Sequence, residues 1–288
     1  MAALSHWLTA DSSALYIIVT LLGLLVGSFL NVVIHRLPLM LQRGWQQECA
    51  EFNGQPPAEL PAFNLCTPRS RCPHCRHQLS ALDNIPLLSW LWLRGRCRYC
   101  RAGVSKRYPL VELASAALAA LALWRFGASP QLLAALLFSW ALLCMTLIDI
   151  DHLLLPDNLT LPLLWLGLLL NIKALFVSLP AAVLGAALGY GILWGLYWLF
   201  KLATGKEGMG YGDFKLLAAI GAWFGWQALL PVLLLASLVG SVLGLALMAG
   251  KRLGEDRVLP FGPALALAGW LYLLWGEQMM GWYWSMAL

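Results

Sequence analysis

Four aspartates lie beside strongly apolar segments, where an unpaired charge is costly. The segment LIDIDHLLLPDN carries Asp149, Asp151 and Asp157, and the segment GMGYGDFK carries Asp213. A carboxylate placed in the apolar part of a bilayer costs roughly 2.5–3.5 kcal/mol on insertion scales, so such groups are hydrated, paired or used chemically. Two carboxylates brought together can activate a water molecule against a peptide carbonyl, as in aspartic proteases, without a metal or a cofactor.

Spacing decides which aspartate can pair with Asp213. Asp149 and Asp151 are two residues apart, about 200° around a helix, so only one of them can face a given partner. Asp149 still belongs to the apolar run, whereas Asp151 is next to His152 and nearer to water. We therefore expect Asp149 to face Asp213, with Asp151 in a supporting or solvated position and Asp157 hydrated at the membrane surface.

Other residues near this pair are expected to support it. Gly210 and Gly212 give the backbone freedom and let a substrate approach closely. Lys215 either contacts a substrate carbonyl or lipid headgroup or simply extends to the membrane surface. Glu112 lies one turn into another apolar segment, at the same membrane face. GMGYG also matches a nucleotide-binding glycine loop, but that loop follows a β-strand, and here an apolar span precedes it.

Four cysteines form two CxxC pairs. Cys72 and Cys75 in CPHC are separated by 21 residues from Cys97 and Cys100 in CRYC. This spacing is typical of a tetrahedral zinc site, and four thiolates leave no position for a catalytic water. Disulfides or free thiols are the alternatives, but a reducing cytosolic location disfavours disulfides. We predict a structural Zn²⁺ site, and we interpret the remaining cysteines as ordinary thiols: Cys49, Cys66 and Cys144.

The composition is that of a membrane protein. Hydrophobic residues make up 60% of the 288 residues and charged residues only 11%, against about 25% in soluble domains. We expect an all-α polytopic protein with about eight transmembrane helices and a cytoplasmic zinc-binding loop. The expected spans are 14–34, 109–126, 131–149, 159–172, 179–200, 214–226, 228–249 and 259–276, of which 159–172 and 214–226 are short for a full crossing.

The basic residues give the orientation. With eight spans, all but two of the 19 lysines and arginines, Arg125 and Lys173, fall on one side, which the positive-inside rule makes cytoplasmic. The basic cluster at 93–108 is then expected to contact anionic lipid headgroups rather than nucleic acid. The expected division of the chain is a first anchor, a cytoplasmic loop with the zinc site, and a membrane-embedded peptidase core: 1–34, 35–108 and 109–288.

Several motifs together resemble one family. They are GSFLNVVIHRLP, the CPHC and CRYC pairs, RYPLVE, LIDIDHLLLPD and GYGDFK, and they are spread over nearly the whole chain. In these motifs the chain resembles the bacterial type IV prepilin peptidases, which are intramembrane aspartic proteases of the GxGD type.

The resemblance implies two activities. Asp149 and Asp213 match the catalytic aspartates of a peptidase that removes a short basic leader from type IV prepilins or type II secretion pseudopilins. Cleavage follows a glycine on the cytoplasmic side of the bacterial inner membrane. The new N-terminal residue is then methylated with S-adenosylmethionine, an activity tied to the cysteine-bearing loop and to a glycine that matches Gly95.

Two other readings fit parts of the sequence. A proton-coupled membrane transporter would explain intramembrane carboxylates and short, glycine-interrupted spans. The carboxylates lie at one face rather than at the midplane, however, and no internal repeat is evident. A zinc-binding membrane adaptor without chemistry would leave the aspartate motifs unexplained.

Overall fold

The computed structural model describes residues 13–56, 61–249 and 260–287, and this part of the chain is helical. Its only extended pairings are two isolated bridges, Arg71 with Gln78 and Arg96 with Gly103. The expected all-α class is therefore confirmed. The chain divides into two compact units, Met1–Ala128 and Ser129–Leu288.

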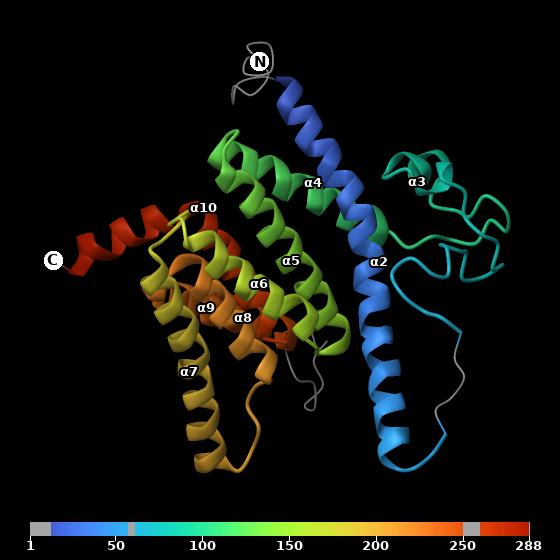
Figure 1. Ribbon diagram of the computed structural model, residues 1–288. Helices are drawn as coiled ribbons and strands as arrows, with labels where there is room; N and C mark the ends of the chain where they lie inside the picture. Colours follow the sequence, from blue (N-terminus) through green and yellow to red (C-terminus); the bar gives the residue numbers. More distant parts are fainter. Residues whose placement is uncertain (1–12, 57–60, 250–259, 288) are drawn as a thin grey trace. The chain divides into compact units, whose positions relative to one another are not determined.

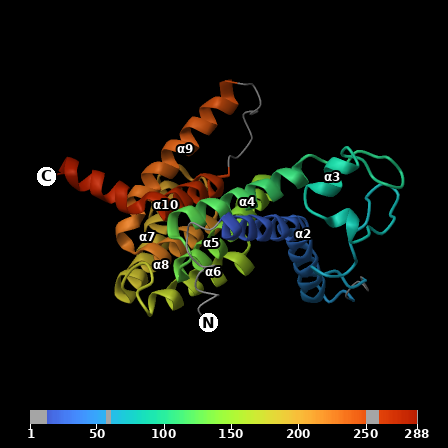
Figure 2. The same cartoon turned by 90° about the horizontal axis from the view of Figure 1, so that it is seen from above.

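The first unit is built on two long helices. Its elements are α2 (Ser13–Phe52), a 3-10 turn (Leu82–Asn84), α3 (Leu88–Trp92) and α4 (Arg107–Phe126) (Figure 1). The segment between α2 and α4 is mostly loop and carries the cysteines; Figure 2 shows it from above, around α3.

Helix α2 is much longer than the span expected at 14–34. It continues through Pro38 to Phe52 as one helix of 40 residues, so the expected cytoplasmic loop begins as helix. The extension is rich in Leu, Gln and Glu, which have high helix propensity. Hydropathy located the apolar part of the helix, but the polar part that follows has no apolar signal.

Small residues bring α2 and α4 into close contact. A Cβ on Gly23 would lie 2.7 Å from the Cα of Ala116, and a Cβ on Gly27 would lie 2.7 Å from the Cα of Glu112. The Ser115 hydroxyl also donates to the Gly23 carbonyl at 2.6 Å. Small residues at this spacing are typical of closely packed membrane helices. This packing assigns α4 to the first unit, whereas the sequence analysis placed it with the peptidase core.

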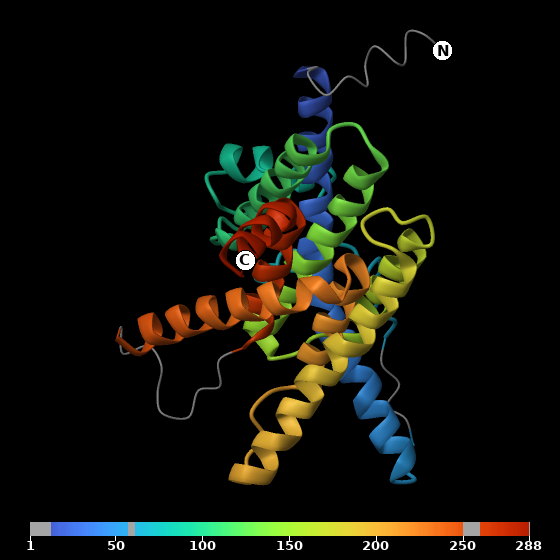
Figure 3. The same cartoon turned by 90° about the vertical axis from the view of Figure 1, so that its left-hand side faces the viewer.

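The second unit holds the remaining helices. They are α5 (Pro130–His152), α6 (Asp157–Asn171), α7 (Leu179–Thr204), α8 (Tyr211–Phe224), α9 (Leu229–Ala249) and α10 (Gly262–Ala287), with a 3-10 turn at Trp226–Ala228. Figures 2 and 3 show α7 and α9 extending away from the centre of this unit in different directions.

Helix α8 is the centre of the second unit. From Asp213 to Phe224 every side chain except Lys215 is buried. Helices α6, α7 and α10 pack against it, and the backbones of Gly185 and Gly221 touch where α7 meets α8. A helix that is buried all round needs apolar residues on every face, which explains why α8 lacks a polar stripe.

Within the part of the chain that the structure describes, five helices are long and apolar enough to cross a membrane. They are Ser13–Phe52, Arg107–Phe126, Pro130–His152, Leu179–Thr204 and Trp226–Ala246. The protein is therefore a multi-pass membrane protein. Helices α6 and α8, with 15 and 14 residues, are as short as their sequence segments indicated, and α10 is interrupted by non-helical backbone at Trp275.

Candidate active site and metal centre

The second unit brings Asp149 and Asp213 close enough to interact electrostatically. Asp149 lies in the last turn of α5, and Asp213 lies in the first turn of α8. Their exposed fractions are only 6% and 7%. The fold thus joins the end of one helix to the start of another, and both carboxylates are shielded from bulk water.

Each carboxylate accepts a backbone hydrogen bond from a glycine. The N–H of Gly210 donates to Asp213, and the N–H of Gly262 donates to Asp149. Gly262 is the first residue of α10. Its amide is therefore among those at a helix start that have no partner within the helix and are free to bind an anionic group.

Gly262 was not found by sequence analysis. A Cβ at this position would contact Asp149 Oδ2, and it would lie 3.1 Å from Leu155 Cδ1. The available signal was the segment PFGP at 260–263, in which a glycine precedes a proline at the start of an apolar helix. The role of Gly262 in this segment depends on its contact with Asp149, which is distant in the sequence.

The two glycines near Asp213 have different surroundings. A Cβ on Gly212 would lie 2.7 Å from the Cβ of Leu155, whereas a Cβ on Gly210 would meet only the Gly212 nitrogen, at 4.0 Å. Gly212 therefore makes room for Leu155, which also packs against Gly262. The space beside Gly210 is open.

Lys215 and Asp157 form an ion pair. The Lys215 ammonium lies 2.6 and 2.8 Å from the two carboxylate oxygens of Asp157 and so joins α8 to the start of α6. Asp157 is thus paired with a lysine, where the sequence analysis expected hydration alone. Asp151 is exposed, in agreement with its expected solvated position.

Glu112 belongs to the first unit, where it is 7% exposed. Its Oε2 accepts a hydrogen bond from the backbone N–H of Leu87 at 2.8 Å. This bond ties α4 to the residue before α3. The expected supporting role of Glu112 beside the aspartates stays a prediction, since the aspartates belong to the second unit.

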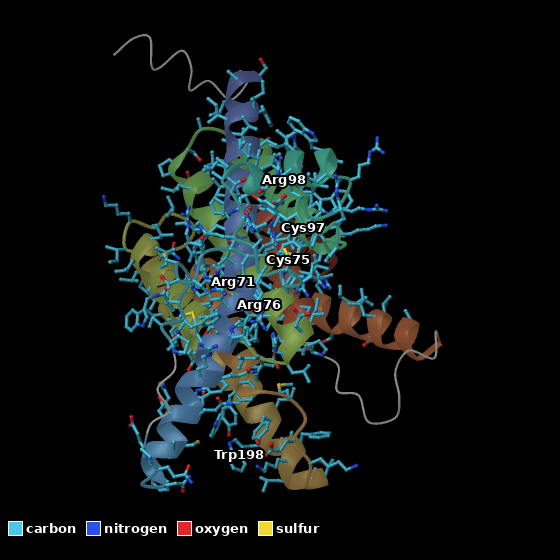
Figure 4. The ribbon with its side chains drawn as sticks, turned by 90° about the vertical axis from the view of Figure 1, so that its right-hand side faces the viewer. Arg71, Cys75, Arg76, Cys97, Arg98 and Trp198 are labelled. Atoms are coloured by element: carbon cyan, nitrogen blue, oxygen red, sulfur yellow. The ribbon has the colours of Figure 1, made fainter. Side chains whose placement is uncertain are left out.

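The four cysteines of the CxxC pairs come together, as predicted. All four sulfur atoms lie within 4.8 Å of one another, and the sulfurs of Cys72 and Cys100 are 3.7 Å apart. A tetrahedron with Zn–S bonds of about 2.3 Å has sulfur–sulfur edges of about 3.8 Å, so the cluster fits Zn²⁺. Figure 4 shows Cys75 and Cys97 beside one another, with Arg98 nearby.

The two CxxC turns have the same backbone design. The Cys72 N–H donates to the His77 carbonyl at 2.9 Å, and the Cys97 N–H donates to the Ala102 carbonyl at 2.8 Å. Each turn also contains an arginine with positive φ, Arg76 at 57° and Arg101 at 58°. This repeated geometry aims two sulfurs from each turn at one point.

The backbone also favours the thiolate form that a metal ligand needs. Backbone amides of Cys75 and His74 donate to the Cys72 sulfur and lower the pKa of this thiol. The backbone amide of Ala102 acts in the same direction on Cys100, although burial and the neighbouring thiols raise the pKa of Cys100 overall. Deprotonated sulfur binds Zn²⁺ directly, so less of the binding energy is lost to proton release at neutral pH.

Two family models match this chain. Residues 21–126 match the family model described as "Bacterial Peptidase A24 N-terminal domain", and residues 136–245 match the "Type IV leader peptidase family". The chain belongs to the type IV leader peptidase family. The second match includes both Asp149 and Asp213, and the first includes all four clustered cysteines.

Close relatives in this family carry one name. The prepilin leader peptidase/N-methyltransferase of Stutzerimonas stutzeri is 56% identical over 96% of each chain. The proteins of that name from Aeromonas hydrophila and Pseudomonas aeruginosa are 58% and 53% identical over 92% and 96% of each chain. No solved structure matches the sequence.

The family resemblance also drew attention to Gly95, which has a φ of +68°. A Cβ at this position would lie 2.8 Å from a ring carbon of Trp90. Glycine is thus required both by the backbone conformation and by the indole that packs on it.

Proposed function

We propose that this protein is a prepilin leader peptidase and N-methyltransferase. The observation that carries the proposal is the buried pair Asp149 and Asp213, which joins two helices of a unit that matches the type IV leader peptidase family. The peptidase removes a short basic leader after a glycine. The methyltransferase then modifies the new N-terminus with S-adenosylmethionine.

Peptide cleavage uses the two carboxyl groups as a pair. Two negative charges close together in a poorly hydrated site repel one another, so one carboxyl group holds a proton while the other is ionised. The ionised group removes a proton from a water molecule, whose oxygen attacks the peptide carbonyl. The protonated group donates to the carbonyl oxygen, where negative charge develops. The proton taken from water then passes to the amide nitrogen as the C–N bond breaks, which releases the leader and the new N-terminal amine.

The surrounding backbone holds the pair in position. The amides of Gly210 and Gly262 each donate to one carboxylate. The open space beside Gly210 allows the substrate backbone to approach Asp213. Gly212, Lys215 and Asp151 have positioning or surface roles: Gly212 makes room for Leu155, and Lys215 holds α8 to α6 through Asp157.

The distribution of basic residues supports a cytoplasmic active site. With eight spans, 14–34 as an anchor and 109–288 as the embedded core, the pair lies at the inner face of the bacterial inner membrane. A basic leader remains on that side, because lysine and arginine are retained in the cytoplasm. The substrates are type IV prepilins or type II secretion pseudopilins, each with an apolar helix in the bilayer.

The four cysteines support a structural role for zinc in the segment 35–108. Cys72, Cys75, Cys97 and Cys100 would hold Zn²⁺ and close the loop that joins α2 to α4. A segment with so little regular structure gains much of its order from a bound metal. Glu112 contributes to the same order by bonding the Leu87 amide.

One experiment tests both activities. The purified full-length protein is incubated with a prepilin and S-adenosylmethionine, and the product is measured by intact mass spectrometry. We expect loss of the leader mass and gain of one methyl group. An uncut prepilin contradicts the peptidase function, and a cut but unmethylated product contradicts the methyltransferase function.

A further inference from the structure

The first unit contains a large cavity of about 1090 Å³. It lies between α2, the start of α4 and the cysteine-bearing segment. Its volume is just above the range of roughly 300–1,000 Å³ that is usual for sites enclosing drug-sized ligands. The aspartate pair belongs to the second unit, and neither Asp149 nor Asp213 lines this cavity.

The lining combines three kinds of side chain. Aromatic rings come from Phe63, Trp90 and Tyr108, and carboxylates come from Asp83 and Glu112. Arginines also line it: Arg36, Arg43, Arg69, Arg71, Arg96 and Arg98. A cavity with flat apolar surfaces and charges of both signs suits a ligand that is itself aromatic and zwitterionic.

Several of the arginines are already engaged with the protein. Arg36 donates to three backbone carbonyls of the segment 64–68, at 2.7 to 3.2 Å. Arg98 donates to Asp83 at 2.7 Å, and the Arg43 guanidinium lies 4.3 Å from the centre of the Phe63 ring. These contacts hold the three side chains in place, and the Arg98–Asp83 pair compensates one positive charge of the lining.

We propose that this cavity binds S-adenosylmethionine, the methyl donor of the N-methyltransferase. The proposal rests on the proposed function, which requires a site for a donor. The flat adenine of the donor matches the aromatic rings, and its carboxylate matches an arginine. Its ammonium and sulfonium groups are cations, which carboxylates and aromatic faces attract.

Trp90 is held by contacts on two sides. Its indole N–H donates to the Val104 carbonyl at 3.3 Å, and Gly95 leaves the space that its ring occupies. The ring is thus held from two sides while it lines the cavity. A ring fixed in advance loses little conformational freedom when a base stacks on it.

A phospholipid headgroup is the main competing ligand, because basic residues near a membrane attract anionic lipids. A headgroup phosphate would use only the arginines of the lining and would leave the Glu112 carboxylate without a cationic partner. The aromatic side chains of the lining also have no counterpart in a headgroup. These features favour the sulfonium nucleoside.

Hydrogen exchange on the unaltered protein locates the ligand. The full-length protein in phosphatidylcholine nanodiscs is compared with and without S-adenosylhomocysteine, the unreactive product of the donor. We expect slower exchange at 61–73 and 86–98, which carry much of the lining. Slower exchange only within 129–288 would overturn the proposal. So would protection of 61–73 and 86–98 by added phosphatidylglycerol but not by S-adenosylhomocysteine.

A matched pair of tryptophan variants tests the aromatic contact. Trp90→Ala should weaken S-adenosylhomocysteine binding, measured by calorimetry, at least tenfold. Trp92→Ala, on the same short helix but 87% exposed and outside the cavity, should leave the Kd within twofold. Zinc content is measured for both variants. A Trp90→Ala protein with full zinc content and an unchanged Kd would overturn the proposal. If this variant loses zinc, the hydrogen-exchange experiment on the unaltered protein decides whether the cavity binds the ligand.

The outcomes separate the cavity from the overall function. If the wild-type protein methylates its substrate but S-adenosylhomocysteine slows hydrogen exchange only outside 61–73 and 86–98, only the cavity assignment is refuted. A wild-type protein that neither binds S-adenosylhomocysteine nor methylates refutes the methyltransferase function and the cavity assignment together.

Discussion

The backbone N–H of Gly262 donates to the carboxylate of Asp149, and any side chain at position 262 would collide with that carboxylate. The start of α10 therefore fixes the end of α5. A hydrogen bond from a helix start both orients a carboxylate and stabilises its ionised form. In the proposed mechanism this contact holds Asp149 at the position from which it can meet Asp213.

Gly262→Ala should reduce leader cleavage at least tenfold. The added methyl group would contact Asp149 Oδ2 and displace the carboxylate, and small displacements of a catalytic group have large effects on rate. The control is Gly281→Ala on the same helix, where an added Cβ meets nothing within 4 Å. Cleavage rates with a prepilin substrate compare the two; equal rates would contradict a positioning role for Gly262.

Asp149→Asn and Asp213→Asn should each abolish leader removal. Asparagine keeps the shape of the side chain but cannot take or give the proton that the mechanism requires. Glu207→Gln is a matched control, because Glu207 is exposed and pairs with Lys201. Gel-shift assays in membranes measure the cleaved fraction, and normal processing by either aspartate variant would refute the assignment.

Cys72→Ser should lower the zinc content from about one ion per chain to near zero. Three thiolates and a hydroxyl bind Zn²⁺ far more weakly than four thiolates, because the site loses a ligand and its closed geometry. Cys49→Ser is the control, since Cys49 is exposed and outside the cluster. Elemental analysis of purified protein measures the metal, and unchanged zinc in Cys72→Ser would contradict the site.

Asn171→Ala should destabilise the second unit by about 2 kcal/mol or more. The Asn171 side chain is 1% exposed. It donates to the carbonyls of Ala222 and Trp223 and accepts from the amides of Phe176 and Val177. Its loss leaves buried backbone groups unpaired.

Thermal unfolding in detergent measures this effect. Asn158→Ala, at an exposed position of α6, is the control and should leave the midpoint nearly unchanged. A similar midpoint for both variants would show that the Asn171 bonds contribute little to stability.

Local patterns in the sequence predicted the features that depend on nearby residues. The CxxC spacing predicted the cysteine cluster because each pair forms its own turn. The 200° separation along one helix predicted that Asp149 would be buried and Asp151 exposed, as observed. Apolar runs located the helices, since burial in lipid needs only a continuous stretch of suitable length.

Features that depend on distant residues were not predicted. The bond from Gly262 to Asp149 and the pair of Lys215 with Asp157 join different helices, and no local pattern reports such contacts. The polar half of α2 was missed because it lacks the apolar periodicity used to find helices. Glu112 lies in the first unit, so its expected place at the same membrane face as the aspartates stays a prediction.

The unbroken course of α2 gives one wall of the cavity two different surroundings. The helix contributes Leu25 and Arg43 to the same cavity wall, and these residues are separated by about 27 Å along a helix that rises about 1.5 Å per residue. On the proposed orientation the wall reaches from lipid depth into the cytosol. On that orientation, a donor enters the cavity from water at one end of this wall, and an acceptor still anchored in lipid reaches the other end.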